Sequence, residues 1–583
     1  MKNLFTLLAV LISLNAWAIF QQDMRSDTHF SDLNTVYLQD GTNDYIVAGS
    51  LFNNAYDSAR LSITRIDDVT GNIVWTKIYE DLLFSSFRGF DIDRYNDGQE
   101  KIALTGLVRD TTMGYNNAII ALFEAVNGNL LSSRTYTGVG NHPNSQGLHI
   151  IYTQTMINMM PMPGFVIAGF MNDSYNNSMA QSNIGFVMRV DTSLLPLWTK
   201  TFENDNLVGV DYDVVNNITE TSDGYFLTGS RSKALSIPPF YFQEVLAMKV
   251  DFYGDFVWES SYIHNNGNGI GADAKYVASE DNIYLLANYD NAQFFGVTVI
   301  DNATGIINTI SSWYGQESST QGWFGFELSE SFNANNMVVH GYKRDNTLMN
   351  SSAVLTAVQT TPFAYEFLRS TGAQVKTIQY EVLYETPSSM NDFFYFWNTS
   401  IPKAYFPDMA FRAPMSELKY FAVGLRTQGV INTKIEMIQT DNVLDNTCNS
   451  SLYNITVNPI SPMVFSDSLN YGFLPFNNVT FVGSIPSYNI ASCLTGGYIV
   501  PPPSGITDFK SALVSIYPNP ANDVLNVSFE GEIKQIVIFN MMGAKMIVSE
   551  ETKIDVASLN AGVYLMQIQS TKGTILSSSF VKK

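Results

Sequence analysis

The feature that most constrains the fold is a pattern of short strands that recurs through the middle of the chain. Each copy begins with an apolar strand that ends in a small residue and a glycine, as in Gly224–Gly229. A polar loop follows, then a strand that ends in Asp, a glycine turn and an aromatic strand. Equivalent glycines of the first four copies, Gly49, Gly106, Gly169 and Gly229, are 57, 63 and 60 residues apart. A fixed period of short strands indicates repetition of one structural unit.

Weaker copies extend the pattern to seven, and the last contains Tyr420–Gly424 and ends near Cys448. A further strand precedes the small-Gly strand in each copy, for instance Phe87–Ile92, which gives four strands per copy. Four-stranded units arranged radially form a β-propeller. We therefore predict an all-β chain with a seven-bladed β-propeller at residues 24–455. A β-helix is the alternative, but it usually has shorter rungs and lacks a recurring Trp.

The best copies also resemble the repeats of large propellers in exported Bacteroidetes proteins. The resemblance rests on units such as Asp44–Ser50 and Gly71–Tyr79, and on their equivalents in the third and fourth copies. It implies a fold and a compartment, and it implies no chemistry.

The final residues form a separate β module, at 511–583, behind a Pro-rich linker at 500–510. A rigid turn opens the module, because Pro518 and Pro520 each fix their φ angle on either side of Asn519. Alternating apolar runs follow, as expected for short strands. This pattern predicts that the module is a small β-sandwich.

This module resembles the type A C-terminal sorting domain of Bacteroidetes proteins that leave the cell through the type IX secretion system. The resemblance implies recognition of 511–583 by the secretion translocon and its outer-membrane shuttle protein, and a location outside the cell or on its outer surface. The residues that carry it are the turn, a glycine–tyrosine step and the basic end of the chain: Pro518, Asn519, Pro520, Gly562, Tyr564, Lys582 and Lys583.

The N-terminus has the pattern of a secretory signal peptide at residues 1–18. Lys2 supplies a positive start, Leu4–Leu14 is an apolar core, and Ala16 and Ala18 form a small-x-small cleavage site. The apolar core is too short for a lasting membrane span, and no later segment has 18 uninterrupted apolar residues, so we expect no transmembrane segment. Together with the C-terminal module, this predicts transport by the Sec pathway and then type IX export.

The composition of the chain excludes some classes of binding partner. The chain has 54 Asp and Glu against 32 Lys and Arg, a formal net charge of −22. Nucleic acids and anionic lipids need dense basic patches, so neither is an expected partner. The only two cysteines, Cys448 and Cys493, predict one disulfide in an exported protein, since no His lies close enough to either to favour a metal site. Residues 456–499 are accordingly predicted to be a disulfide-tied extension.

The sequence gives no catalytic residue, metal site or cofactor. The five histidines are scattered over different copies, and none has metal-ligand spacing to another. The segment Asp91–Gly98 has the acidity of a calcium loop without its spacing, which indicates a turn between strands. Two kinds of residue recur once per copy and are therefore interpreted as architecture, with Asp capping a turn and Trp stacking between blades: Asp67, Asp191, Asp251, Asp301, Trp75, Trp198, Trp258 and Trp313.

Two functions remain open. The first is a non-enzymatic surface propeller for adhesion, gliding-related attachment or binding of a glycan or another surface ligand. The alternative is a secreted hydrolase of polysaccharide or peptide, which needs paired carboxylates in the central cleft. The fold alone does not distinguish the two. The side chains of the central channel are the observation that does.

Overall fold

The computed structural model divides the chain into two compact units, residues 1–500 and 501–583. Every regular element among the residues that it describes is a β-strand. Those residues are 20–25, 29–52, 58–80, 84–110, 114–138, 143–157, 160–172, 183–202, 213–234, 241–263, 269–289, 294–316, 321–345, 360–380, 408–411, 419–428, 432–441, 444, 450–453, 456–459, 463–464, 476–478, 482–484, 489–494, 497–499, 515–528, 533–540, 545–570 and 575–583.

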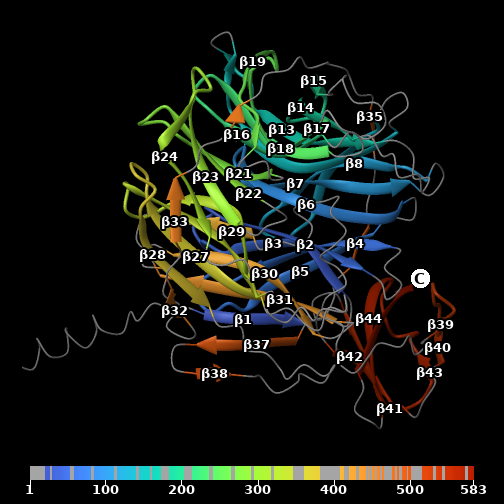
Figure 1. The fold of residues 1–583 in the computed structure, drawn as a ribbon. Helices are drawn as coiled ribbons and strands as arrows, with labels where there is room; N and C mark the ends of the chain where they lie inside the picture. Colours follow the sequence, from blue (N-terminus) through green and yellow to red (C-terminus); the bar gives the residue numbers. More distant parts are fainter. Residues whose placement is uncertain are drawn as a thin grey trace, which may run out of the picture. The chain divides into compact units, whose positions relative to one another are not determined.

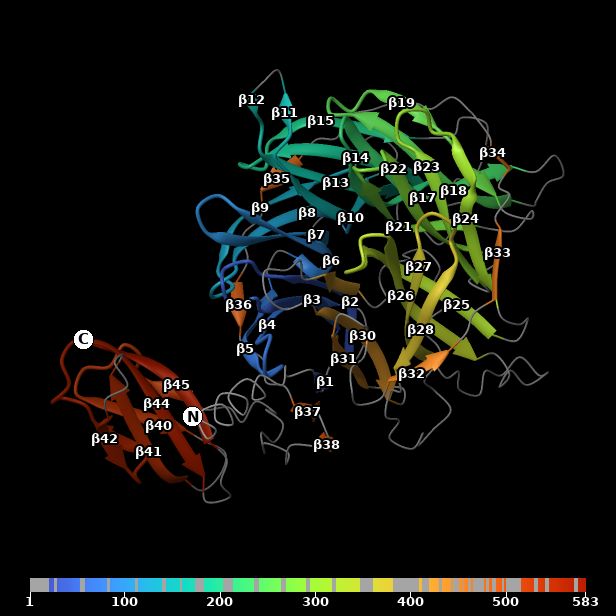
Figure 2. The same ribbon diagram turned by 90° about the vertical axis from the view of Figure 1, so that its left-hand side faces the viewer.

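The first unit is a propeller-like ring of antiparallel sheets, and each of six sheets is built from strands that follow one another in the sequence (Figures 1 and 2). The predicted four-stranded unit is therefore confirmed, with the first strand innermost. The strands of the first three blades are β2 (His29–Tyr37), β3 (Tyr45–Phe52), β4 (Ala59–Ile66) and β5 (Ile73–Glu80); β6 (Phe84–Asn96), β7 (Glu100–Asp110), β8 (Asn116–Glu124) and β9 (Leu130–Tyr136); and β10 (Asn144–Thr153), β13 (Gly164–Asn172), β14 (Asn183–Asp191) and β15 (Pro196–Phe202), with the small hairpin β11 (Met156–Ile157) and β12 (Met160–Pro161) inserted.

The next three blades follow the same plan, and in the fourth the outermost strand is interrupted. Their strands are β16 (Val214–Glu220), β17 (Gly224–Ala234), β18 (Tyr241–Asp251), β19 (Phe256–Glu259) and β20 (Tyr262–Ile263); β21 (Gly269–Val277), β22 (Asn282–Tyr289), β23 (Phe294–Asp301) and β24 (Ile307–Gln316); and β25 (Gln321–Glu330), β26 (Asn336–Asp345), β27 (Thr360–Leu368) and β28 (Gln374–Tyr380).

The predicted count of seven blades is not confirmed, because the structure has six regular blades. The seventh copy instead contributes to a mixed six-stranded sheet, which takes strands from three distant parts of the chain. The N-terminal strand lies between the last propeller strand and a strand from near residue 490. In order across the sheet, the strands are β29 (Asp408–Phe411), β30 (Tyr420–Gln428), β31 (Asn432–Thr440), β1 (Phe20–Arg25), β37 (Asn489–Leu494) and β38 (Gly497–Ile499).

The repeated glycine is explained by a β-bulge in the innermost strand of each regular blade. In the fourth blade the register shifts between Val215 and Asn217, opposite Gly229. A Cβ on Gly229 would lie 2.0 Å from the carbonyl oxygen of Val214, so no larger residue fits there. The same close approach to an inner-strand carbonyl occurs at Gly106, Gly169 and Gly341. A bulge re-aims the side chain that follows it, and here it does so at the same place in every blade.

We predict that Gly229→Ala destabilises the propeller by about 1–3 kcal/mol, because the new methyl group forces the bulge away from the second strand. Thermal or denaturant unfolding of the purified protein measures the change in the free energy of unfolding. Ala287 occupies the matching place in the fifth blade, opposite Gly271. The control Ala287→Gly should cost no more than about 1 kcal/mol, the usual entropic effect of glycine. Equal losses in the two variants would contradict this explanation of the glycine repeat.

The recurring Asp and Trp residues have the architectural roles expected from their repetition. The Oδ1 atom of Asp251 accepts hydrogen bonds from the backbone N–H groups of Tyr253 and Asp255, both at 2.8 Å, and so caps the turn. The Trp258 ring packs over Gly305, the turn glycine of the next blade, and its Nε1 donates to the carbonyl of Asn302 (2.9 Å). Equivalent Trp–Gly contacts join the other blades at Trp75 and Gly128, Trp198 and Gly254, and Trp313 and Gly372.

Buried cations reinforce the same junctions between blades. Lys249, fully buried, donates from Nζ to the carbonyl of Asn302 (2.9 Å), the same carbonyl that Trp258 reaches. Arg65 Nη1 donates to the carbonyl of Ala125 (3.1 Å), and Arg189 Nη1 donates to that of Phe252 (3.3 Å). At the mixed sheet a neutral amide replaces the cation. There Gln439 Nε2 donates to the carbonyl of Asp68 in the first blade (2.9 Å).

The described strands of residues 450–494 lie along the outside of the ring and add a fifth strand to most blades (Figure 2). We call this segment the strap. Its strands pair with the sixth, fifth, fourth, second and first blades in that order, and then with β1 of the mixed sheet. The strap thus follows the ring against the order of the sequence. Its strands are β32 (Ser450–Tyr453), β33 (Thr456–Pro459), β34 (Met463–Val464), β35 (Phe476–Asn478), β36 (Val482–Ser484) and β37.

The disulfide between Cys448 and Cys493 remains a prediction, because Cys448 lies outside the described residues. Cys493 lies on β37, the last strand of the strap, and pairs with Gln21 of β1. A bond to Cys448, two residues before β32 begins, would join the two ends of the strap. Closing a loop of this length stabilises the fold by up to about 4 kcal/mol in the loop-entropy account.

We therefore expect one disulfide-linked peptide pair when the non-reduced exported protein is digested and analysed by mass spectrometry. The double variant Cys448→Ser, Cys493→Ser should unfold at lower temperature than the native chain. Each single variant should show the same loss, since either removes the bond. Two free thiols in the exported protein would contradict the prediction.

The second unit is a small two-sheet β-sandwich, as expected. Its buried core joins both sheets through side chains such as Leu525, Ile536, Met566 and Phe580. The strands are β39 (Ser515–Tyr517), β40 (Val524–Ser528) and β43 (Lys553–Asp555) in one sheet, and β42 (Lys545–Ser549), β41 (Ile533–Asn540), β44 (Gly562–Ser570) and β45 (Ile575–Lys582) in the other.

Candidate functional site

The six inner-strand bulges each place one polar residue at the same level of the central channel. We call these residues the inner ring. Each directly follows the bulge in its strand. The residue type at this position changes from one blade to the next, so the position is not recognisable in the sequence repeat. Their order around the propeller is Asn34, Asp91, His149, Asn217, Asp273 and Glu327.

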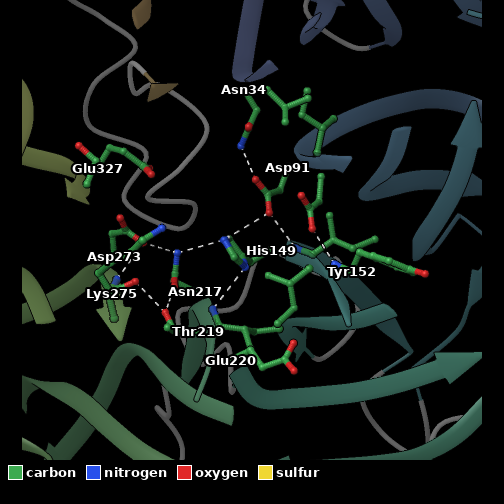
Figure 3. A pocket seen from close by; sticks show the side chains of 18 of the residues that line it. Asn34, Asp91, His149, Tyr152, Asn217, Thr219, Glu220, Asp273, Lys275 and Glu327 are labelled. Atoms are coloured by element: carbon green, nitrogen blue, oxygen red, sulfur yellow. Dashed lines mark hydrogen bonds and ion pairs between the residues drawn. The ribbon is translucent and has the colours of Figure 1, made fainter. Parts of the chain in front are cut away.

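Hydrogen bonds through this ring link each of the first five blades to the next. Figure 3 shows those among the labelled side chains. Asp91 Oδ2 accepts from the backbone N–H of Ile150 (2.7 Å), which follows His149 in the next blade. Nδ1 of His149 in turn accepts from the N–H of Ile218 (3.3 Å), which follows Asn217. Asp273 Oδ2 accepts from the N–H of Leu328 (2.7 Å), which follows Glu327. The ring therefore fixes the spacing of the inner strands.

Side chains of the ring also contact one another. Asn34 Nδ2 donates to Asp91 Oδ1, and Nε2 of His149 lies 3.5 Å from Asp91 Oδ2. The amide Nδ2 of Asn217 lies 3.0 Å from Nε2 of His149 and donates to Oδ1 of Asp273 (2.7 Å). Two carboxylates thus hold the imidazole and the amide between them.

A cavity of about 580 Å³ lies over the ring and is lined by the inner strands of all six regular blades. Such a volume is within the usual range of small-ligand sites. Three residues beyond each ring position, the strands contribute a second set of side chains, which we call the rim. Around the propeller the rim consists of Tyr37, Arg94, Tyr152, Glu220, Tyr276 and Glu330.

The cavity is electronegative. Among its described lining residues are six carboxylates, against the two cations Arg94 and Lys275. Arg94 is already engaged, since its guanidinium lies 4.7 Å from the centre of the Tyr37 ring and 3.6 Å from Glu100. Desolvation raises the pKa of Asp93 to about 6, although backbone hydrogen bonds and the nearby cations act to lower it. Asp93 is therefore largely ionised above neutral pH.

Three of the carboxylates already accept hydrogen bonds from other groups of the propeller at both oxygens. In Asp93, Oδ1 accepts from the N–H of Arg94 (2.8 Å) and Oδ2 from the N–H of Tyr152 (2.6 Å). Asp91 and Asp273 likewise accept hydrogen bonds at both oxygens. A carboxylate bonded to two fixed donors is poorly placed to transfer a proton or attack a substrate.

The structure revises the interpretation of two sequence features. His149, expected to be an isolated histidine, is a member of the inner ring. The segment Asp91–Gly98 includes the β6–β7 turn, but Asp91 and Asp93 lie within strand β6 and face the channel. Only the arrangement of the inner strands of different blades around one channel brings these residues together, so no local motif could have identified them.

The other candidates drawn from the sequence lie elsewhere. His340 is buried against the ring of Tyr420, and burial lowers its pKa to about 3. His142, His264, Ala16 and Ala18 lie outside the described residues. Within the described ranges, no group of three or more His, Cys, Asp or Glu side chains is arranged to hold a metal ion. Nor does that part of the chain contain a helix long and apolar enough to cross a membrane.

In the second unit, the three parts of the predicted sorting motif meet around strand β45. The Oδ1 atom of Asn519 accepts from the N–H of Val581 (2.9 Å). The N–H of Ala521 donates to the carbonyl of Val581 (2.7 Å), and the N–H of Lys583 donates to that of Ala521 (2.9 Å). The proline turn is thereby tied to the last three residues of the sequence.

The glycine–tyrosine step supports the same strand. Gly562 pairs with Lys582 at the end of the β44–β45 ladder. Tyr564 stacks on Phe580, with 5.7 Å between ring centres, and its hydroxyl donates to the carbonyl of Asn560 (2.9 Å). The proline turn, the glycine–tyrosine step and the basic C-terminal residues therefore form one structural unit, although they are far apart in the sequence.

Comparison with protein families agrees with this geometry. Residues 515–583 match the family model described as a secretion system C-terminal sorting domain. They are a type IX sorting domain. The chain is therefore cargo of the type IX secretion system, which carries it to the cell surface or the extracellular space. No curated protein matches the chain.

We expect deletion of residues 511–583 to abolish export, because this removes the sorting domain and leaves the other compact unit intact. Cell fractionation and surface proteolysis should find the truncated propeller inside the cell envelope. Conversely, residues 500–583 fused to a periplasmic reporter should carry the reporter outside. The same fusion with Asn519→Ala tests the tie between the turn and the chain end, and its export should fall. Normal export of the truncated chain would contradict the assignment.

Proposed function

We propose that the exported chain is a non-enzymatic binding protein and that the cavity over the inner ring is its ligand site. The observation that carries the proposal is the convergence of six inner strands on one polar cavity. A rigid ring that presents polar and aromatic side chains in a concave site is typical of small-molecule recognition.

The rim supplies groups that suit a small polar ligand. Tyr152 and Tyr276 line the cavity, while the Tyr152 ring also packs against Tyr95 and Phe165 and the Tyr276 hydroxyl donates to Asp281 (2.8 Å). Glu330 provides a hydrogen-bond acceptor, as does Glu220, which accepts one hydrogen bond from Thr155 Oγ1 (3.0 Å). Their backbones are held by sheet pairing in four different blades. A ligand held there by a protein displayed outside the cell is consistent with adhesion or with capture of a nutrient or signal.

The hydrolase alternative is kept because Asp93, in the cavity wall, has a raised pKa of about 6, a property also found in catalytic acids. Against it, Asp91, Asp93 and Asp273 already accept hydrogen bonds at both oxygens. These hydrogen bonds favour binding over catalysis.

The test is a ligand screen on the purified exported protein, using a panel of mono- and oligosaccharides, amines and short peptides, read by calorimetry and by chromatography of the incubated ligands. We expect saturable binding without cleavage. The variant Tyr152→Ala, at the rim, should weaken binding, whereas Tyr253→Ala, on the exposed outer hairpin of the fourth blade, should not. Cleavage that is lost in Asp93→Asn would favour the hydrolase instead.

A further inference from the structure

The cavity combines acidic and aromatic groups with a buried hydroxyl. We propose that it binds a ligand through an ammonium or guanidinium group, held between the rim tyrosines and the rim carboxylates. This inference rests on the proposed function, since it names the ligand chemistry of the same cavity.

The first observation is the balance of charge. Six described carboxylates line the cavity, and of its two cations Arg94 is engaged with Tyr37 and Glu100. A concave site lined by one sign of charge concentrates ions of the opposite sign. The net charge of −22 on the whole chain acts in the same direction.

The second observation is a buried hydroxyl in the cavity wall. Ser329 lies on β25, two residues beyond the ring residue Glu327, and is only 3% exposed. Its Oγ has no hydrogen-bond partner among the described residues. Burying a hydroxyl without a partner is costly, so a ligand donor such as N–H would satisfy it.

The third observation is that the rim already holds a cation. The guanidinium of Arg94 lies 4.7 Å from the centre of the Tyr37 ring, within the range of a cation–π contact. Tyr152 and Tyr276 stand at the equivalent rim positions of their blades, and Glu220 lies between them in the order around the ring. Aromatic faces alternating with carboxylates are a typical environment for organic cations.

The ammonium could belong to a small amine or to a basic side chain of a peptide, and matched ligand pairs distinguish these sources. In one pair, glucosamine is compared with N-acetylglucosamine, which keeps the sugar ring and removes the charge. In the other, a lysine tripeptide is compared with its Nε-acetyl-lysine form. We expect the charged member of at least one pair to bind at least about tenfold more tightly, and its affinity to fall as salt is added.

Two variants test the residues. Glu220→Gln should weaken binding of the charged ligand about tenfold. The matched control is Asp255→Asn on an exposed outer hairpin, where the carboxylate is 71% exposed, and it should have no effect. Ser329→Ala should also weaken binding severalfold while leaving thermal stability unchanged or raised, because the hydroxyl has no partner to lose. A purely structural Ser329 would leave binding unchanged.

The outcomes separate the two proposals. Equal binding of charged and acetylated ligands would overturn the cation inference and leave the cavity as the ligand site. If none of these ligands binds and the wider panel also gives no binding, both proposals fail. Tight binding of a charged ligand that is unaffected by Glu220→Gln and Ser329→Ala would place the cation elsewhere and overturn the inference.

Discussion

The propeller depends on the close contact between a glycine in the second strand and a bulge in the first. At Gly106, Gly169, Gly229 and Gly341 the missing side chain leaves room for an inner-strand carbonyl that a Cβ would meet at 2.0 Å or less. The residue after the bulge lies toward the neighbouring blade, where Asp91, His149 and Asp273 each accept a hydrogen bond from a backbone N–H. In these four blades the glycine makes room for the bulge that precedes the polar ring residue, whereas in the fifth blade the same bulge lies opposite Ala287.

The contacts between blades repeat with substitutions that keep the geometry and change the chemistry. The carbonyl after the third strand is reached by Arg65, Arg189 or Lys249, and by neutral Gln439 at the mixed sheet. A buried cation bonded to a carbonyl is stable only with compensating acceptors. Arg65 has these in Asp44 and Asp40, and Lys249 has one in Asp223. The junctions are therefore polar inside an otherwise apolar core.

Much of this fold could be predicted from the sequence, because period and strand pattern are local. The four-stranded unit, the capping role of Asp251 and the packing role of Trp258 all follow from repetition. The inner ring could not be predicted, because its members share a position and differ in residue type, from Asn34 through His149 to Glu327. The count of seven blades is not confirmed, because the seventh copy lies in a mixed sheet that also contains β1, a strand without the repeat pattern. The strap was missed because its strands are two to six residues long and have no period.

The strap also has a consequence for solubility. A sheet edge with free N–H and C=O groups readily pairs with another chain, and a propeller has one such edge per blade on its outer surface. The strap occupies this edge in the first, second, fourth, fifth and sixth blades and covers β1 of the mixed sheet. Because it pairs through the backbone, its own sequence is free to vary. A chain that must cross a crowded envelope thereby carries its own protection against edge-to-edge aggregation, supplied by the segment that precedes its export signal in the sequence.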